Sequence, residues 1–370
     1  MKAMILAAGK GTRVRPLTYE MPKPMIPIMG KPVMEYLIEE LERHGFDEIV
    51  INVSHLPEKI ENYFGNGERF GVEIGYSFEG HIENDEIVST ALGSAGGLKR
   101  IQEFSGFFDD TFIVVCGDAL IDLDLTKAVR DHWRSGAMAS ICTLEVPKSQ
   151  VPNYGVVVSD VNGSITSFQE KPSVEEALSS QVNTGIYIFE PEIFDLIPVD
   201  EKFDIGSQLF PKMVEQSLPL HAINLPFNWI DIGRISDFWE ANQKIMQGKL
   251  RTIPMPGKML REGVWAGLNV AIEAGADIQG PVYIGSGSKI EAGCQIVGPT
   301  WIGNGCHIRS GARVSRSIIF DYTRIGSGSI VQESVAFGRF FVDKEGNKFE
   351  SDNMRVDWVS DSRIKDETTV

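Results

Sequence analysis

A glycine turn that carries fixed positive charge opens the chain. An apolar run at positions 3–8 is followed by Gly9 and Gly11, and the cations Arg13 and Lys23 come soon after. A continuous apolar run is typical of a buried parallel strand, and glycines let the backbone turn with its N–H groups facing an anion. The stretch therefore indicates a phosphate-binding loop, with a plain strand-to-helix turn as the alternative.

Two better-known glycine loops do not fit this stretch. A dinucleotide-binding fingerprint needs G-x-G-x-x-G and an acidic residue roughly 20 positions further on. Here Val14 occupies the third glycine position, and the second expected strand ends in Asn52, Val53 and Ser54, without an acid. The P-loop pattern G-x-x-x-x-G-K-[ST] is absent as well.

Two carboxylates stand where parallel strands are expected to end. Asp118 follows the apolar run 112–116, and Asp231 follows Trp229 and Ile230. Ligands of open parallel sheets bind beyond the carboxyl ends of the strands, although a single acid at such a place often only caps the next helix. Mg²⁺ needs one or two protein carboxylates together with phosphate oxygens, so the pair predicts a magnesium site.

The composition limits the class of partner and the compartment. A chain of 370 residues with 42% apolar residues can bury a sizeable core and form two domains. Its net charge of −16 argues against nucleic acid or an anionic membrane as partner. We expect a cytoplasmic protein, because the sequence shows neither a membrane-spanning run nor a signal-peptide pattern. The four widely spaced cysteines are expected to be buried, reduced thiols.

Strands alternate with helical patterns from Gly30 to about Asp237, which predicts an α/β domain with a mostly parallel sheet. The segment LGSAGGL at 92–98 places Gly93 and Gly96 just ahead of a helix, where backbone can approach a ligand closely. A glycine-rich helix start explains this segment equally well. The other expected elements are a helix after Pro32, strands at 48–53, 72–78 and 112–116, a helix at 58–64 and an acidic loop at 80–88.

A six-residue period of Ile or Val runs from position 272 to 314 and continues, after a slip of one residue, from 319. This period predicts a parallel β-helix, whose flat faces and uncapped end are expected to stack against another subunit or the catalytic domain. We expect a homo-oligomer, with the β-helix as a candidate contact. Some hexapeptide proteins are acyltransferases, and His307 could serve as their general base. It lacks a long neighbouring loop insertion, so we favour a surface histidine. The tail is expected to form a hairpin around 345–347 and then to fray.

The motifs together resemble those of the sugar-1-phosphate nucleotidylyltransferases, also called NDP-sugar pyrophosphorylases. The resemblance rests on GKGTRVRPLT with PKPMIPIMGKP, then LGSAG, FQEKP, NTGIY and WIDIG in that order, and it covers most of the chain. It implies a Rossmann-like nucleotidyltransferase domain with a mostly parallel mixed sheet, followed by a left-handed parallel β-helix. We expect a catalytic domain at 1–247, a linker at 248–263, the β-helix at 264–342 and a tail at 343–370.

The resemblance also implies roles for individual residues. Arg13 and Lys23 would stabilise the charge on leaving pyrophosphate, and Asp118 and Asp231 would hold Mg²⁺. The nucleotide would contact Leu6, Ala8, Gly9, Gly11, Thr12, Arg13, Lys23, Gly93, Gly96 and Asp118. The sugar phosphate would contact Gly155, Glu170, Lys171 and Asn183.

The motif order is most similar to that of mannose-1-phosphate guanylyltransferases. Thymidylyl- and uridylyl-specific relatives tend to carry a base-reading glutamine a few residues before the second glycine segment, where this chain has Ala91 and its neighbours. We therefore expect GTP and mannose-1-phosphate as substrates, with glucose-1-phosphate thymidylyl-, uridylyl- or adenylyltransferase as the alternative. A non-catalytic regulatory or scaffold relative would be expected to lose the lysine or a carboxylate, and this chain keeps them.

Overall fold

The computed structural model describes residues 1–83, 86–249, 253–338, 340–350 and 358–364. The chain folds into two compact units. Unit 1 comprises Met1–Lys10, Met21–Met25 and Pro32–Trp229. Unit 2 comprises Gly11–Glu20, Ile26–Lys31 and Ile230–Val370.

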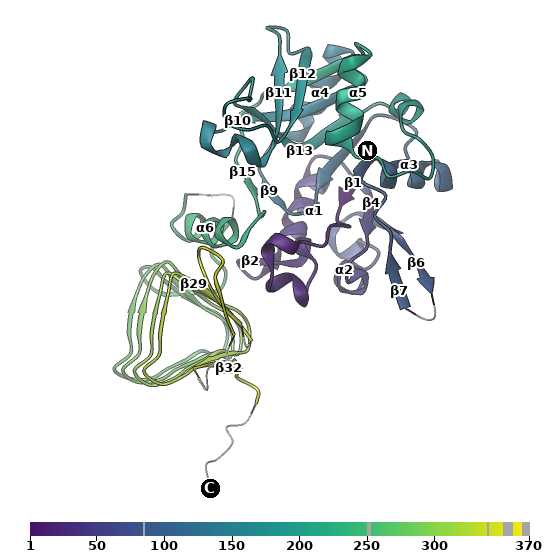
Figure 1. Cartoon of the computed structure of the whole chain (residues 1–370). Helices are drawn as coiled ribbons and strands as arrows, with labels where there is room; N and C mark the ends of the chain where they lie inside the picture. Colours follow the sequence, from purple (N-terminus) through teal and green to yellow (C-terminus); the bar gives the residue numbers. More distant parts are fainter. Residues whose placement is uncertain (84–85, 250–252, 339, 351–357, 365–370) are drawn as a thin grey trace. The chain divides into compact units, whose positions relative to one another are not determined.

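A mixed sheet forms the centre of unit 1 (Figure 1). Its strands follow the order β12-β11-β13-β8-β1-β4-β5, and β10 pairs with both β13 and β14. β1 runs parallel to β4 and β8, β4 runs parallel to β5, and β13 is antiparallel to β8. The strands are β1 (Lys2–Leu6), β4 (Glu48–Val53), β5 (Glu73–Phe78), β8 (Phe112–Cys116), β10 (Ala139–Glu145), β11 (Gly155–Ser159), β12 (Ile165–Glu170), β13 (Gln181–Phe189) and β14 (Leu220–Ile223).

Helices cover both faces of this sheet, because successive strand residues point to opposite sides. Ala3 and Ile5 of β1 pack into one apolar core with α1, α2 and α4, whereas Met4 packs into a second core with α3 and α5. On α1, the buried Leu37 and Leu41 lie one turn apart on the face toward the sheet. The helices are α1 (Val33–Arg43), α2 (Pro57–Phe64), α3 (Ser94–Ser105), α4 (Leu125–Ser135) and α5 (Phe210–Glu215).

The predicted α/β architecture is confirmed, and the strands at 48–53 and 112–116 have the predicted bounds. The prediction of an acidic loop at 80–88 is wrong. β6 (Gly80–Glu83) and β7 (Glu86–Ser89) pair as an antiparallel hairpin, between which residues 84 and 85 lie outside the described part. Shorter strands are β2 (Pro27–Ile28), β3 (Lys31–Pro32), β9 (Ala119–Ile121) and β15 (Trp229–Asp231).

Unit 2 contains the parallel β-helix that the six-residue period predicted. Strands of successive coils stack into three sheets, which give the coil its triangular outline in Figure 1. Ile290 pairs with Ile308, three hexads on, and Ile308 pairs with Ile325, one residue short of three hexads, so the predicted slip is confirmed. These three side chains are fully buried, whereas Ile272 is 39% exposed, because no earlier coil covers its strand among the described residues.

Antiparallel strands extend the β-helix at both ends. β16 (Lys258–Arg261), inside the expected linker, pairs with β17 (Val264–Ala266). The predicted hairpin around 345–347 is confirmed, since β30 (Phe340–Asp343) pairs with β31 (Lys348–Glu350). The prediction that the tail then frays is wrong for its described part, because β32 (Val359–Asp361) pairs with β27 of the last coil. The coil strands are β18 (Ala271–Ile272), β19 (Asp277–Gln279), β20 (Val282–Ile284), β21 (Lys289–Ile290), β22 (Gln295–Val297), β23 (Thr300–Ile302), β24 (His307–Ile308), β25 (Arg313–Ser315), β26 (Ile318–Ile319), β27 (Thr323–Ile325), β28 (Ile330–Gln332) and β29 (Ser334–Phe337).

Two further expectations can be compared with the structure. The four cysteines are free thiols, of which Cys142, Cys294 and Cys306 are buried and Cys116 is partly buried. Among the described residues, no helix combines the length and the apolar character that a membrane crossing requires.

Candidate active site

Lys23 and Asp118 form an ion pair at the carboxyl end of the parallel strands of unit 1. Asp118 comes two residues after β8, and β8 lies directly beside β1. Both side chains are largely buried, with 12% of the Lys23 side chain and 22% of the Asp118 side chain exposed. The lysine predicted to stabilise pyrophosphate and the aspartate predicted to hold the metal are therefore in contact.

The backbone around Lys23 is packed against the sheet. Gly117 donates its N–H to the Leu6 carbonyl at 3.0 Å. A Cβ atom at position 117 would lie 3.4 Å from Pro24 Cγ and 2.9 Å from Ile5. Pro24 is itself buried. The proline-flanked lysine is thus held against the ends of β1 and β8, because the missing side chain at position 117 lets Pro24 pack closely.

The first glycine turn begins in unit 1. Leu6 ends β1, Ala8 is partly buried, and Gly9 is exposed with open space where a Cβ would be. Its continuation belongs to unit 2. Gly11 has a left-handed φ of 59° and precedes the short helical turn Thr12–Val14.

The second glycine segment is shaped by protein packing. A Cβ at Gly93 would lie 2.5 Å from the carbonyl oxygen of Phe203, and one at Gly96 would lie 2.9 Å from that of Glu201. Ala95 and Gly96 donate their N–H groups to the Phe203 carbonyl at 3.0 and 2.8 Å. The glycines are therefore required for contact with the 201–203 segment, whatever they contact in a ligand complex.

The predicted sugar-binding residues Gly155 and Glu170 lie side by side. They are paired in adjacent strands β11 and β12, and a Cβ at Gly155 would lie 3.2 Å from Glu170 Oε2. Lys171 Nζ forms an ion pair with Glu170 Oε1 at 2.9 Å, and 56% of the Lys171 side chain is exposed. Its φ of 49° lies in the left-handed region, which is unusual for a residue other than glycine.

Asn183 has a role within its own strand. Its Oδ1 accepts the N–H of Gly185 at 2.9 Å, and its Nδ2 donates to the Tyr187 hydroxyl at 3.0 Å. Gly185 has a left-handed φ of 76°, and a Cβ there would lie 2.7 Å from Cys116 Sγ. Asn183 therefore stabilises an irregular bend in β13 beside the end of β8.

Three arginines line a pocket of about 290 Å³ in unit 2. Arg13 is joined there by Arg15 and by Arg234, which directly precedes helix α6 (Ile235–Met246). Glu345 and Gly346, from the tip of the β30–β31 hairpin, complete the lining with Ile235 and Ser236. A concentration of guanidinium groups at a helix N-terminus is suited to a phosphate group.

The carboxylate of Asp237 lies near that of Asp231. A Cβ at Gly233 would lie 3.2 Å from Oδ2 of both Asp231 and Asp237. Burial, opposed by Arg234, raises the pKa of the Asp237 carboxyl. The described residues contain no cluster of three or more His, Cys, Asp or Glu side chains suited to a metal. A single carboxylate, such as that of Asp118 in unit 1 or that of Asp231 in unit 2, can serve as a ligand of Mg²⁺, which takes its remaining oxygens from phosphate and water.

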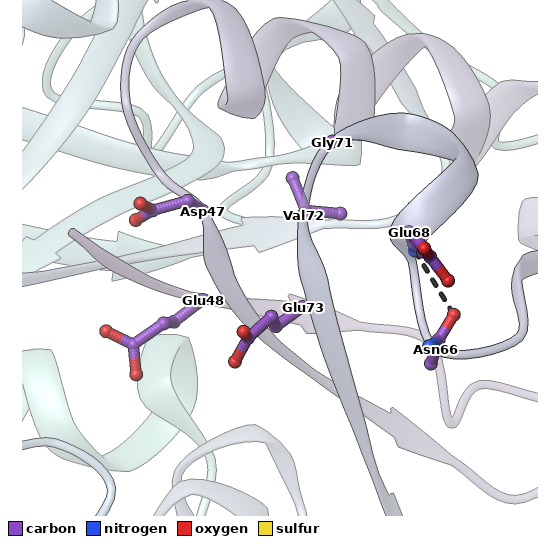
Figure 2. A pocket seen from close by; sticks show the side chains of 7 residues that line it. All are labelled: Asp47, Glu48, Asn66, Glu68, Gly71, Val72 and Glu73. Carbon is purple, nitrogen blue, oxygen red and sulfur yellow. Dashed lines mark hydrogen bonds between the residues drawn. The ribbon is translucent and has the colours of Figure 1, made fainter.

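Figure 2 shows an acidic pocket of unit 1. It has a volume of about 710 Å³ and is lined by Asp47, Glu48, Asn66, Glu68, Gly71, Val72 and Glu73. Glu48 and Glu73 begin β4 and β5, so the pocket is at the amino ends of the parallel strands. Its carboxylates would repel a triphosphate, and none of the predicted site residues lines it.

A buried Ser–His–Glu chain lies elsewhere in unit 1. His132 Nδ1 is 2.7 Å from Ser140 Oγ, and its Nε2 is 3.0 Å from Glu190 Oε1. This order of groups occurs in enzymes with a nucleophilic serine. Ser140 is 0% exposed, so a substrate cannot reach it, and the chain is structural. His307, in unit 2, lies 2.7 Å from Glu291 on the outside of a regular coil.

An α/β sheet with lysine, aspartate and glycine turns at the carboxyl ends of its strands defines a nucleotide-binding enzyme. Comparison with known proteins agrees: the model of the nucleotidyl transferase family matches residues 2–248, and that of the GMPPB C-terminal domain matches residues 278–340. The chain belongs to the nucleotidyl transferase family, among the sugar-1-phosphate nucleotidylyltransferases.

Individual relatives differ in their named substrates. A UTP–glucose-1-phosphate uridylyltransferase of Synechocystis is 55% identical over 365 residues, covering 98% of this chain and 94% of the relative. A mannose-1-phosphate guanylyltransferase catalytic subunit beta of Drosophila melanogaster is 34% identical over 64% of this chain and 60% of its own length. A solved UDP-glucose pyrophosphorylase complexed with UDP-glucose aligns with a TM-score of 0.55 and 21% identity, over 66% of this chain and 98% of the other, which shows the shared fold.

Sequence reasoning misses two charged neighbours of the predicted residues. The sequence pattern identifies Arg234 only as the start of a helix, and it gives no role to Asp237. Asp231 ends β15 and Arg234 is an extended residue before α6, so no helical spacing relates them, and the sequence alone carries no signal for their proximity.

Proposed function

We propose that this protein transfers the uridylyl group of UTP to glucose-1-phosphate, releasing pyrophosphate and forming UDP-glucose. The observation that carries this choice is the 55% identity to the Synechocystis uridylyltransferase along almost the whole of both chains. It weighs against the purine nucleotide that Ala91 favoured, because that preference rested on one position.

The chemistry follows from the charges of the candidate residues. The phosphate oxygen of the sugar attacks the α-phosphorus of the NTP, the bond to the bridging oxygen breaks, and pyrophosphate leaves. No covalent enzyme intermediate is needed, because positioning and charge stabilisation account for most of the catalysis of such transfers. Lys23 and Arg13 would stabilise the negative charge that accumulates on pyrophosphate.

Asp118 and Asp231 are the proposed ligands of Mg²⁺. The bound ion would screen the triphosphate and polarise the α-phosphate. Asp118 accepts a hydrogen bond from Lys23, so the ion pair holds the two charged groups side by side at the ends of β1 and β8.

The sugar phosphate is assigned to the Gly155–Glu170–Lys171 group. The Glu170 carboxylate can accept hydrogen bonds from sugar hydroxyls, and its bond to Lys171 holds an exposed ammonium group beside it for the phosphate. Asn183, which is engaged with Gly185 and Tyr187, supports the shape of β13 and can contact the sugar through its remaining hydrogen-bonding capacity.

A substrate panel tests the proposal. UTP, GTP, dTTP and ATP would each be combined with glucose-1-phosphate and mannose-1-phosphate, and pyrophosphate release would be measured. The proposal requires the highest kcat/KM for UTP with glucose-1-phosphate. A clear preference for GTP with mannose-1-phosphate would support the guanylyltransferase alternative, which the match to the GMPPB C-terminal domain favours. The panel is run on the full chain with Mg²⁺ present.

A further inference from the structure

Two buried polar side chains connect the start of the first glycine turn with the second glycine segment, all within unit 1. Asn52 is the last residue but one of β4, and Glu79 directly follows β5. Each residue is 3% exposed. Burying a carboxyl group costs free energy unless the group has hydrogen-bond or charged partners. The partners of Glu79 therefore indicate what its burial achieves.

The contacts form a continuous chain. Ala7 donates its backbone N–H to Asn52 Oδ1 at 2.7 Å, and Asn52 Nδ2 donates to Glu79 Oε1 at 2.6 Å. Leu92 donates its backbone N–H to Glu79 Oε2 at 3.4 Å. Ala7 precedes the first glycine turn by two residues, and Leu92 immediately precedes Gly93. One end of the chain is therefore fixed to the first glycine segment and the other to the second.

The second segment also packs on this pair. A Cβ at Gly97 would lie 2.5 Å from Glu79 Oε1 and 3.3 Å from Asn52 Nδ2. Any larger residue at position 97 would push helix α3 away from the carboxylate. Burial raises the pKa of Glu79, and its hydrogen bonds with Asn52 and Leu92, together with the charge of Arg100, oppose that rise.

We propose that Asn52 and Glu79 are positioning residues, which set the distance between the two backbone segments that hold the nucleotide. The inference rests on the proposed function, because it takes both glycine segments to be nucleotide-binding. Neither side chain needs to touch the ligand. The pair orients backbone N–H groups, and its loss should weaken nucleotide binding specifically.

The positioning role can be tested by exchanging which side chain of the pair donates the hydrogen bond and which accepts it. In Glu79→Gln the new amide can still accept from Asn52, but its NH₂ then faces the N–H of Leu92, and the contact with the second segment is lost. The double variant Asn52→Asp/Glu79→Gln reverses the middle bond. The carboxylate now at position 52 accepts from Ala7 and from the amide NH₂ at position 79, while the amide carbonyl accepts from Leu92. The whole chain is thus restored with the same net charge.

We expect Glu79→Gln to raise the KM for UTP about tenfold, the factor that one buried hydrogen bond corresponds to. The KM for glucose-1-phosphate should stay within about twofold. The double variant should return the KM for UTP to near the wild-type value. Isothermal titration with UTP alone, in the absence of sugar, gives a second readout that does not depend on turnover.

Thr111→Val is the matched control. Thr111 is 9% exposed and makes hydrogen bonds with Glu190 and Trp133. It directly precedes β8, so it lies at the amino ends of the parallel strands, opposite to the candidate site of unit 1. This variant should lower Tm while leaving both KM values unchanged. A merely structural role for Glu79 would make Glu79→Gln behave in the same way.

The outcomes separate the two proposals. If wild-type protein prefers another NTP, the uridylyl assignment fails and the same variants are measured with that NTP. If Glu79→Gln leaves nucleotide binding unchanged, changes both KM values equally, or is not rescued by the double variant, the positioning role is wrong while the proposed function stands. If the wild type binds no NTP, both proposals are wrong.

Discussion

Lys23 donates a hydrogen bond from its ammonium group to the carboxylate of Asp118, across 95 residues of sequence. A lysine between two prolines could have been a rigid surface turn. The structure instead buries most of its side chain against the end of β8. Proline on either side restricts the backbone, and the ion pair holds the side chain, so the ammonium group has a defined position beside Asp118.

Lys23→Met should lower kcat and kcat/KM together. The methionine keeps most of the apolar stem but removes the charge that would meet leaving pyrophosphate. Loss of one preorganised charge contact is worth on the order of 3 kcal/mol, or about a hundredfold in rate. Steady-state kinetics of pyrophosphate release measure this.

Lys2→Met provides the control for Lys23→Met. Lys2 begins β1 and pairs with Asp109 at 2.6 Å, with 20% of its side chain exposed. The variant loses an ion pair with Asp109, whose side chain is 68% exposed, at the amino end of β1, and should keep full activity. A Lys23→Met rate within about threefold of wild type at saturating substrates would rule out the catalytic role of Lys23.

Asp118→Asn should reduce turnover by at least about a hundredfold, because the nearly isosteric amide is a weak ligand for Mg²⁺. The same loss is expected for Asp231→Asn in unit 2. Turnover is measured over a range of Mg²⁺ concentrations, with Asp109→Asn as the control for removal of a lysine-paired carboxylate. Full activity of either site variant at ordinary Mg²⁺ would exclude that residue as a metal ligand.

Local signals account for the parts of the fold that could be predicted. The strands Glu48–Val53 and Phe112–Cys116 are apolar runs with clear ends, and the six-residue period depends on side-chain direction alone. The sequence of the β6–β7 hairpin predicts a loop, because its many acidic residues hide the alternation of apolar and polar residues that is expected of a strand. Within the described part of the chain the two strands pair only with each other, so no strand of the central sheet helps to reveal them.

The candidate site is harder to predict from the sequence than the fold is, for a different reason. The sequence pattern suggests that Gly93 makes room for a ligand, but its missing side chain already makes room for the Phe203 carbonyl, more than 100 positions away. The bond between Asn52 and Glu79 likewise joins the ends of two strands. Motifs indicate which residue types are present, whereas these long-range contacts arise only when the strands are placed side by side.

Lys171→Ala should raise the KM for glucose-1-phosphate about tenfold and leave the KM for UTP nearly unchanged, because an ammonium–phosphate contact made in the ground state contributes mainly to KM. Initial rates with each substrate varied in turn measure both constants. Lys127→Ala is the control, since Lys127 is 68% exposed and pairs with Asp124 at 2.9 Å, as Lys171 does with Glu170. Equal changes in both constants would contradict the assignment of Lys171 to the sugar phosphate.

The stability of unit 1 should depend on His132 under mildly acidic conditions. Burial lowers the pKa of His132, Glu190 opposes that shift, and the charge of His221 adds to it. A histidine whose folded pKa lies below its unfolded pKa binds fewer protons in the folded state. Its contribution to stability is therefore complete above the unfolded value of about 6.5 and is lost as the pH falls below it.

His132→Gln tests this dependence. Glutamine can keep a hydrogen bond to Ser140 or Glu190 but does not titrate. The variant should therefore be less stable than wild type at pH 8 and should lose less stability between pH 7 and pH 5. The difference in the free energy of unfolding is about 1.4 kcal/mol for each unit by which the folded and unfolded pKa of His132 differ. Urea unfolding followed at several pH values gives the free energy of unfolding of both proteins. Carboxylates that do not contact position 132 contribute equally to both proteins and cancel in the comparison. Glu190, which lies 3.0 Å from His132 Nε2, is the exception. Parallel stability curves for wild type and His132→Gln would mean that His132 does not change its protonation on unfolding, and that the buried Ser140–His132–Glu190 chain has no influence on the acid sensitivity of the fold.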